Sequence, residues 1–228
     1  ILDWVQAREI TISAYGLREG LLLEMIGVES LPITVDLRGV WAWVVGGCTG
    51  GGRAVERVRL VGLQGFGQLA EGLDPEPEES GLLEAAALLH DVGQMVSYRK
   101  HHKHSYQLIM HAERLNLDPR QRSLVALISR YHRRKGPRKN DKEFGSLEPG
   151  DQQLVRRLAG ILRVADGLDR GHTATAESIT TELAGSRLLI TVAPRLANAD
   201  LSLECWSAMQ KSDVLAKLLE REVVIRTN

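Results

Sequence analysis

The sequence predicts a mainly α-helical protein that ends in a small α+β domain. Between about residues 73 and 172, apolar residues recur with the period of an α-helix, between residues typical of helix caps and turns. After residue 173 the pattern changes to the alternation of β-strands. The 228 residues, 43% of them hydrophobic, can bury the core of one moderate domain and a smaller one.

The segments before residue 73 carry weaker patterns. Residues 1–26 predict a strand over 9–13, a glycine-bounded turn over 15–20 and a helix start at 21, and we expect the chain to be a piece of a longer protein. Residues 27–72 hold eleven of the 22 glycines. Glycine costs about 1 kcal/mol in a helix relative to alanine, so poor order is expected in the first half of this segment, before helical periodicity returns over 53–73.

Four helices are expected between residues 73 and 172. Ser80 is a candidate N-cap for the first helix, which ends at His90 and Asp91 before Gly93. The others are expected over 105–115, from Asp118-Pro119 to about 134, and over 148–168. In the last segment, 178–182 and 187–192 predict a hairpin, followed by a strand over 201–206, a helix over 211–221 and a strand over 223–226.

Charge and cysteine content restrict the class of protein. The chain has 29 Lys and Arg and 29 Asp and Glu, so no global field favours a nucleic acid or a membrane as partner. No apolar run reaches the roughly 18 residues of a membrane-spanning helix. Cys48 and Cys205 lie far apart without metal-type spacing, which favours a reducing, cytoplasmic location.

The helical segment carries a candidate metal site. His90 and Asp91 place an imidazole and a carboxylate at one helix end, and Asp166 lies beside the apolar face of the last helix. These three residues are candidate ligands for a divalent metal, Mg²⁺ or Mn²⁺, that would hold a phosphate. The alternative, a buried hydrogen-bond network without metal, remains open.

Further histidines and acidic residues have two interpretations each. His104 is a candidate extra ligand or the cap of the helix that starts at 105, and His132 is an extra ligand or a helix-end cation. His101 and His102 are expected to be solvated loop residues, and Asp169 is expected at the surface.

A dense basic run ends the third helix and continues into the loop. Its guanidinium and ammonium groups suit a polyphosphate or a nucleotide phosphate, although a solvated basic face is the alternative. The candidate phosphate-binding residues are Arg130, Arg133, Arg134, Lys135, Arg138 and Lys139.

Four motifs in order resemble the HD-type helical domain of the exopolyphosphatase/guanosine pentaphosphate phosphohydrolase family. They are residues 82–91, 101–106, 129–133 and 161–170. Residues 15–20 look like the motif that closes the actin-like catalytic portion of that family, and the segment with Leu203-Glu204 and Lys211 is similar to its tail.

The resemblance implies four regions: the end of an actin-like domain (1–26), an atypical connection (27–72), an HD-like helical domain (73–172) and a small α+β domain (173–228). It implies a polyanion-binding and dimerisation region of a phosphohydrolase whose full-length form releases terminal phosphate from polyphosphate or guanosine pentaphosphate. A homodimer is expected.

Two departures from the family keep other functions open. The acidic catalytic residues of the family belong to actin-like domains that this chain lacks, so we expect little phosphate release by the chain alone. The HD superfamily also has a histidine one helix upstream, where Gly51, Gly52 or Arg53 stands here. The alternatives are an autonomous metal-dependent HD phosphohydrolase acting on a nucleotide, and a non-catalytic interaction module.

Overall fold

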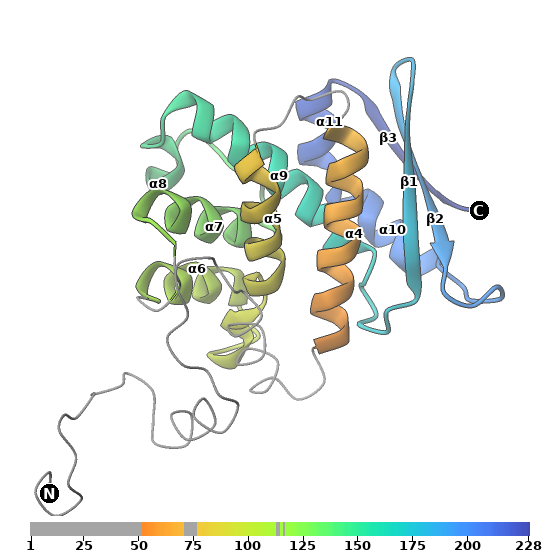
Figure 1. Cartoon of the computed structure of the whole chain (residues 1–228), viewed down its shortest axis with the longest axis horizontal. Helices are drawn as coiled ribbons and strands as arrows, with labels where there is room; N and C mark the ends of the chain where they lie inside the picture. Colours follow the sequence, from red (N-terminus) through yellow and green to blue (C-terminus); the bar gives the residue numbers. More distant parts are fainter. Residues whose placement is uncertain (1–51, 71–76, 113–114, 116) are drawn as a thin grey trace, which may run out of the picture.

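A computed structural model describes residues 52–70, 77–112, 115 and 117–228 of the chain. The strand, turn and helix start expected within 1–26, and the poorly ordered part of the connection, lie outside the described residues. In the described part, a helical bundle stands on one side and a small sheet on the other, with helix α4 (Gly52–Ala70) between them (Figure 1).

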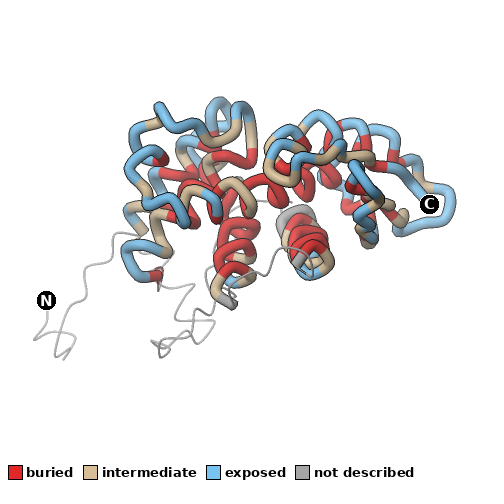
Figure 2. The backbone as a smooth tube through the Cα atoms, turned by 90° about the horizontal axis from the view of Figure 1, so that it is seen from above, coloured by how far each residue is buried: buried red, intermediate tan, exposed pale blue. Residues whose placement is uncertain are grey.

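The bundle is built around three helices, α5 (Pro77–Leu89), α7 (Pro119–Tyr131) and α9 (Pro149–Gly167), which pack against one another. Helix α6 (His101–His111) packs on α7 and on the 3₁₀ helix η1 (Val92–Met95), and the short helix α8 (Lys142–Gly145) precedes α9. Residues 124–128 of α7 are entirely buried, and Figure 2 shows buried residues on the inner faces of the helices. This packing of apolar faces supplies most of the stabilisation.

The starts of α7 and α9 are confirmed, and those of α5 and α6 differ from the prediction. Asp118 forms a capping box with Gln121 at the start of α7. Helix α5 begins at Pro77, so Ser80 lies inside it and is not its N-cap. Helix α6 begins at His101 rather than at Ser105, because His101, His102, Ser105 and Ile109 form one buried face.

The sheet contains β1 (Ala176–Ala184), β2 (Arg187–Pro194) and β3 (Glu222–Thr227) in that order. The predicted hairpin is confirmed: β1 and β2 are antiparallel around a two-residue loop in which Gly185 has a φ of 58°. Strand β3 pairs with β2 in parallel. The connection from β2 to β3 therefore crosses over through helices, as a parallel pair requires.

Helix α4 covers the free edge of the sheet with two glutamine side chains. The backbone N–H of Ile179 donates to Gln64 at 3.0 Å and that of Thr181 donates to Gln68 at 2.6 Å. The amide of Gln68 donates in turn to the carbonyl of Ile179 at 3.0 Å. These bonds satisfy edge groups of β1 that would otherwise be open to another strand.

The strand expected over 201–206 is wrong, because these residues begin helix α10 (Ser202–Lys211). Leu201, Leu203 and Cys205 alternate like strand residues, but the side chain of Leu203 is 52% exposed and that of Trp206 59%. Glu204, Cys205 and Ala208 form the buried face, which has helical spacing. Helix α11 (Asp213–Leu219) follows and connects to β3.

The described chain is thus mainly α-helical with a three-stranded sheet at its C-terminal end. Among the described residues, no helix combines the length and the apolar character needed to cross a membrane.

Candidate metal and phosphate site

Several helix ends meet at one pocket. His90 and Asp91 follow the end of α5, His132 follows the end of α7, Asp166 lies in the last turn of α9 and Lys211 ends α10. The C-terminal end of a helix carries a partial negative charge from its unpaired carbonyls. These helix ends come together with the carboxylates of Asp91 and Asp166, so the pocket is favourable for a cation.

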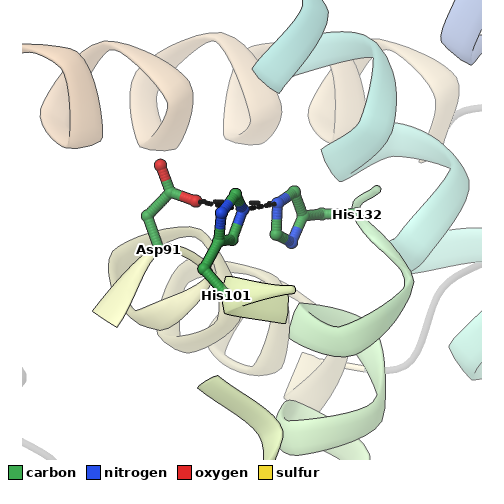
Figure 3. Close-up of side chains that lie close together, drawn as sticks. All are labelled: Asp91, His101 and His132. Carbon is green, nitrogen blue, oxygen red and sulfur yellow. Dashed lines mark hydrogen bonds and ion pairs between the residues drawn. The ribbon is translucent and has the colours of Figure 1, made fainter. Parts of the chain in front are cut away.

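Asp91, His101 and His132 point toward one another (Figure 3). Oδ1 of Asp91 lies 3.1 Å from Nε2 of His101 and 3.6 Å from Nε2 of His132. The two Nε2 atoms are 3.2 Å apart. One ligand atom from each residue lies within 4.8 Å of the others, and the two imidazoles are buried. The separations suit three donors around one small ion.

The outer nitrogens of the imidazoles are bound to the backbone. In His90, His101 and His132 alike, Nδ1 contacts the carbonyl three residues earlier, at 2.8, 3.1 and 2.6 Å. Since a carbonyl only accepts, each Nδ1 carries the proton and each Nε2 presents a lone pair. A guanidinium nitrogen of Arg133, 3.4 Å from Nδ1 of His101, is too distant to compete. This arrangement is the one that fixes metal-binding histidines in proteins.

Two lone pairs at 3.2 Å repel each other unless a proton or a metal ion lies between them. Burial lowers the pKa of His132 to about 3, despite the opposing charges of Asp166 and Asp91. A proton on Nε2 of His132 is therefore disfavoured at neutral pH. Burial would raise the pKa of Asp91, but the positive charge that His90, His132 and His101 take on when protonated holds it well below its usual range. The cluster offers the carboxylate of Asp91 and the two imidazoles of His101 and His132.

His90 and Asp166 lie on the other side of Asp91 and extend the cluster there. Nε2 of His90 lies 3.7 Å from Oδ2 of Asp91 and 3.8 Å from Oδ1 of Asp166. The ammonium of Lys211 forms an ion pair with Oδ2 of Asp166. Burial would raise the pKa of Asp166, but Lys211 and the neighbouring imidazoles lower it. This side of the cluster already contains a cation from the protein.

These residues fit a divalent metal. The donor set of Asp91, His101 and His132 has the ligand types, the proton positions and the spacing that a single ion needs. Imidazole is a better ligand for Mn²⁺ than for Mg²⁺, which prefers oxygen, so the set favours Mn²⁺ of the two predicted ions.

The pocket is also lined by basic side chains. Arg133, Arg170, His172 and Lys211 line it together with the acidic residues. Contact with Asp169 raises the pKa of His172, against the effect of burial. The pocket that contains the candidate metal ligands is thus also lined by four groups that carry or can take up positive charge, which are the groups that bind phosphate oxygens in proteins.

The predicted basic run is only partly at this pocket. Arg133 lines it, whereas Arg130 pairs with Glu143 at 3.3 Å and stacks on the rings of Tyr106 and Tyr131. The rest of the run is exposed and is not among the described residues that line the pocket, namely Arg134, Lys135, Arg138 and Lys139.

The predicted metal ligands are partly redistributed. His90, Asp91, Asp166 and His132 are brought together, but His104 lies on α6 against Gly93 and is not among the described lining residues. The expectation of a solvated His101 is wrong: the residue is 3% exposed because α6 begins there.

Two other expectations are also wrong. His102 is 8% exposed rather than solvated, and its pKa falls to about 4 through burial and the nearby charges of His101 and Arg133. Asp169, expected at the surface, is 2% exposed. Its carboxylate accepts the N–H of Ala174 at 2.9 Å and so closes the turn after α9.

The sequence prediction missed His101, Arg170, His172 and Lys211 as pocket residues. His101 lies four residues before Ser105 on the buried face of α6, and this helical spacing is the signal that could have placed it in the site. Arg170 and His172 follow the end of α9, and Lys211 reaches the pocket through the packing of α10 on α9, which no local pattern reports.

Comparison with known proteins assigns the matched region to one family. Residues 53–211 match the family model described as Ppx/GppA phosphatase, domain III. The chain is also 33% identical over 113 residues to a guanosine-5'-triphosphate,3'-diphosphate pyrophosphatase of Pseudoalteromonas atlantica. That alignment covers 48% of this chain and 22% of the relative, so the chain spans about a fifth of the curated protein it matches.

Proposed function

Because the chain belongs to the Ppx/GppA phosphatase family, we propose that it is the C-terminal, polyanion-binding region of an exopolyphosphatase-like phosphohydrolase. It binds phosphate groups of polyphosphate or guanosine pentaphosphate, and the full-length protein releases the terminal phosphate. The matched relative is named for a guanosine phosphate substrate, which supports the second of these ligands.

One observation carries the proposal: the basic groups of Arg133, Arg170 and Lys211 line the same pocket as the histidine–carboxylate cluster. Asp91, His101 and His132 would hold the divalent ion, which would screen the charge of a bound phosphate. The guanidinium of Arg133 lies over the ring of Tyr98, 5.4 Å from its centroid, and is thereby oriented. Arginines fixed in this way bind phosphate oxygens in pairs.

The proposal is tested by polyphosphate binding to two charge-matched double variants. Arg133→Gln with Arg170→Gln removes two guanidinium groups from the pocket, and Arg138→Gln with Lys139→Gln removes two exposed positive charges outside it. We expect at least a tenfold weaker binding for the first pair, with a smaller dependence on salt, and little change for the second. The reverse order would assign binding to the exposed basic run instead.

The histidine–carboxylate cluster favours a second candidate function, an autonomous metal-dependent phosphohydrolase acting on a nucleotide. Phosphate release by the chain, measured with polyphosphate, guanosine pentaphosphate and simple nucleotides, separates the two. We expect little release with either Mg²⁺ or Mn²⁺. Robust metal-dependent turnover that is lost in Asp91→Asn would establish the second function.

Homodimerisation and a cytoplasmic location stay predictions of the family resemblance and of the cysteine content. Light scattering checks the first: a homodimer has twice the 25.2 kDa mass of the chain.

A further inference from the structure

The two oxygens of Asp91 face two different sides of the cluster. Oδ1 lies 3.1 Å from Nε2 of His101, and Oδ2 lies 3.7 Å from Nε2 of His90. A carboxylate that turns one oxygen to each side is the usual bridge between two metal ions in phosphoryl-transfer sites. The cluster therefore has the outline of a site for two cations, with one position on each side of Asp91.

The second position already contains a positive charge. The ammonium of Lys211 contacts Oδ2 of Asp166, and Oδ1 of Asp166 lies 3.8 Å from Nε2 of His90. Asp166 is 9% exposed and Asp91 is half-buried, so a second ion here would meet both carboxylates, together with the lysine, where little water reaches. The second ion and the ammonium of Lys211 would then both lie beside Asp166, and two positive charges so close together repel strongly where water is excluded.

The backbone of Lys211 is fixed at this place. Nε of Arg163 donates to the carbonyl of Lys211 at 3.1 Å, and Nη1 of the same guanidinium donates to the carbonyl of Tyr131 at 3.0 Å. Arg163 is 3% exposed, so it connects the end of α10 to the end of α7, next to His132, from inside the fold. The backbone from which the Lys211 side chain extends is therefore fixed beside the cluster, and the ammonium is held there by its ion pair with Asp166.

We propose that the ammonium of Lys211 takes the place of a second metal ion, so that the site binds one divalent cation, on Asp91, His101 and His132. This inference rests on the metal site of the proposed function. The phosphate pocket then contains one exchangeable cation and one that is part of the chain.

The test is the number of Mn²⁺ ions bound per chain, measured by calorimetric titration and by electron paramagnetic resonance. We expect one ion for the unmodified chain and two for Lys211→Met, with the spectrum of the variant broadened by coupling between two ions that share Asp91. Lys211→Arg keeps the charge and should bind one. Lys217→Met, which removes an exposed lysine of α11, is the matched control and should also bind one.

A double variant keeps the test valid if Lys211→Met alone does not fold. Lys211→Met with Asp166→Asn removes both members of the ion pair, leaves no lone buried charge and should bind one ion. Two ions in the unmodified chain or in this double variant, or one in a folded Lys211→Met, overturn the inference but leave the metal site standing. No bound Mn²⁺ in the unmodified chain overturns the metal site itself, and the inference with it.

Discussion

Replacing Arg163 with methionine should be among the most destabilising single changes in the described chain. The guanidinium donates to the carbonyls of Tyr131 and Arg134 at 3.0 Å each and to that of Lys211 at 3.1 Å. It also contacts Asp213 at 2.7 Å, but the side chain of Asp213 is 61% exposed. The exposed partner loses little in water, so the cost comes from the three carbonyls.

A buried carbonyl that loses its donor costs about 1–3 kcal/mol. Three such groups, with partial rehydration of the outer ones, give an expected loss of about 3–5 kcal/mol in the free energy of unfolding for Arg163→Met. Urea unfolding followed by circular dichroism measures this value, and the slope against urea should stay unchanged. Gln153→Met, at an exposed position of the same helix, is the control and should change stability by less than about 0.5 kcal/mol.

The same variant should also weaken Mn²⁺ binding, because Arg163 joins the ends of the helices that carry His132 and Lys211. A loss below about 1 kcal/mol for Arg163→Met would refute the reasoning, since it would mean that water replaces the guanidinium at all three carbonyls. A loss equal to that of the control would do the same.

Three other changes have defined outcomes. Gly167→Ala should destabilise the fold by more than about 1 kcal/mol in thermal melts, because the new Cβ would lie 2.5 Å from Cα of Ala208, where α9 meets α10; unchanged stability would contradict this close approach. His101→Ala should lose Mn²⁺ binding in a titration, whereas His104→Ala should keep it, and equal affinities would remove His101 from the ligand set. For the metal-free chain, burial lowers the pKa of His132 from 6.5 to about 3. The unfolded chain therefore takes up a proton between these values that the folded chain does not, so stability falls with decreasing pH, by about 2 kcal/mol at pH 5. Urea unfolding at pH 7 and pH 5 should show a smaller decline in His132→Gln, and equal declines would contradict the assignment.

The elements that local chemistry specifies were predictable from sequence. Asp118, Pro119 and Gln121 contain within four residues everything that starts α7, and the loop at Gly185 needs only the residues beside it. Helix α10 was not predictable in this way, because Leu201, Leu203 and Cys205 alternate with the period of a strand. The choice is made by tertiary packing, which buries Glu204 and Ala208 and leaves Leu203 outside.

The residues of the candidate site likewise fall into those that the sequence predicted and those that only tertiary packing brings into the pocket. The His90-Asp91 pair and Asp166 were found because each interrupts an apolar helix with a polar group. Arg170 and Lys211 were not, because a basic residue at a helix end looks the same in sequence whether it faces solvent or a pocket. His101 was assigned to a loop because the helix was predicted to begin at residue 105, whereas α6 begins at His101. That error removed one imidazole from the predicted ligand set.

The position of His101 changes what the missing upstream histidine means. The HD pattern that the sequence resembles places a histidine upstream of the His90-Asp91 pair, where this chain has Gly51, Gly52 or Arg53. The structure places the Nε2 atoms of His101 and His132 within 3.6 Å of Oδ1 of Asp91, and each of these imidazoles is oriented by a carbonyl of its own chain segment. Three ligands with fixed proton positions suffice for a divalent ion that completes its shell with water or phosphate oxygen. The proposed metal site on Asp91, His101 and His132 therefore needs no ligand from α4.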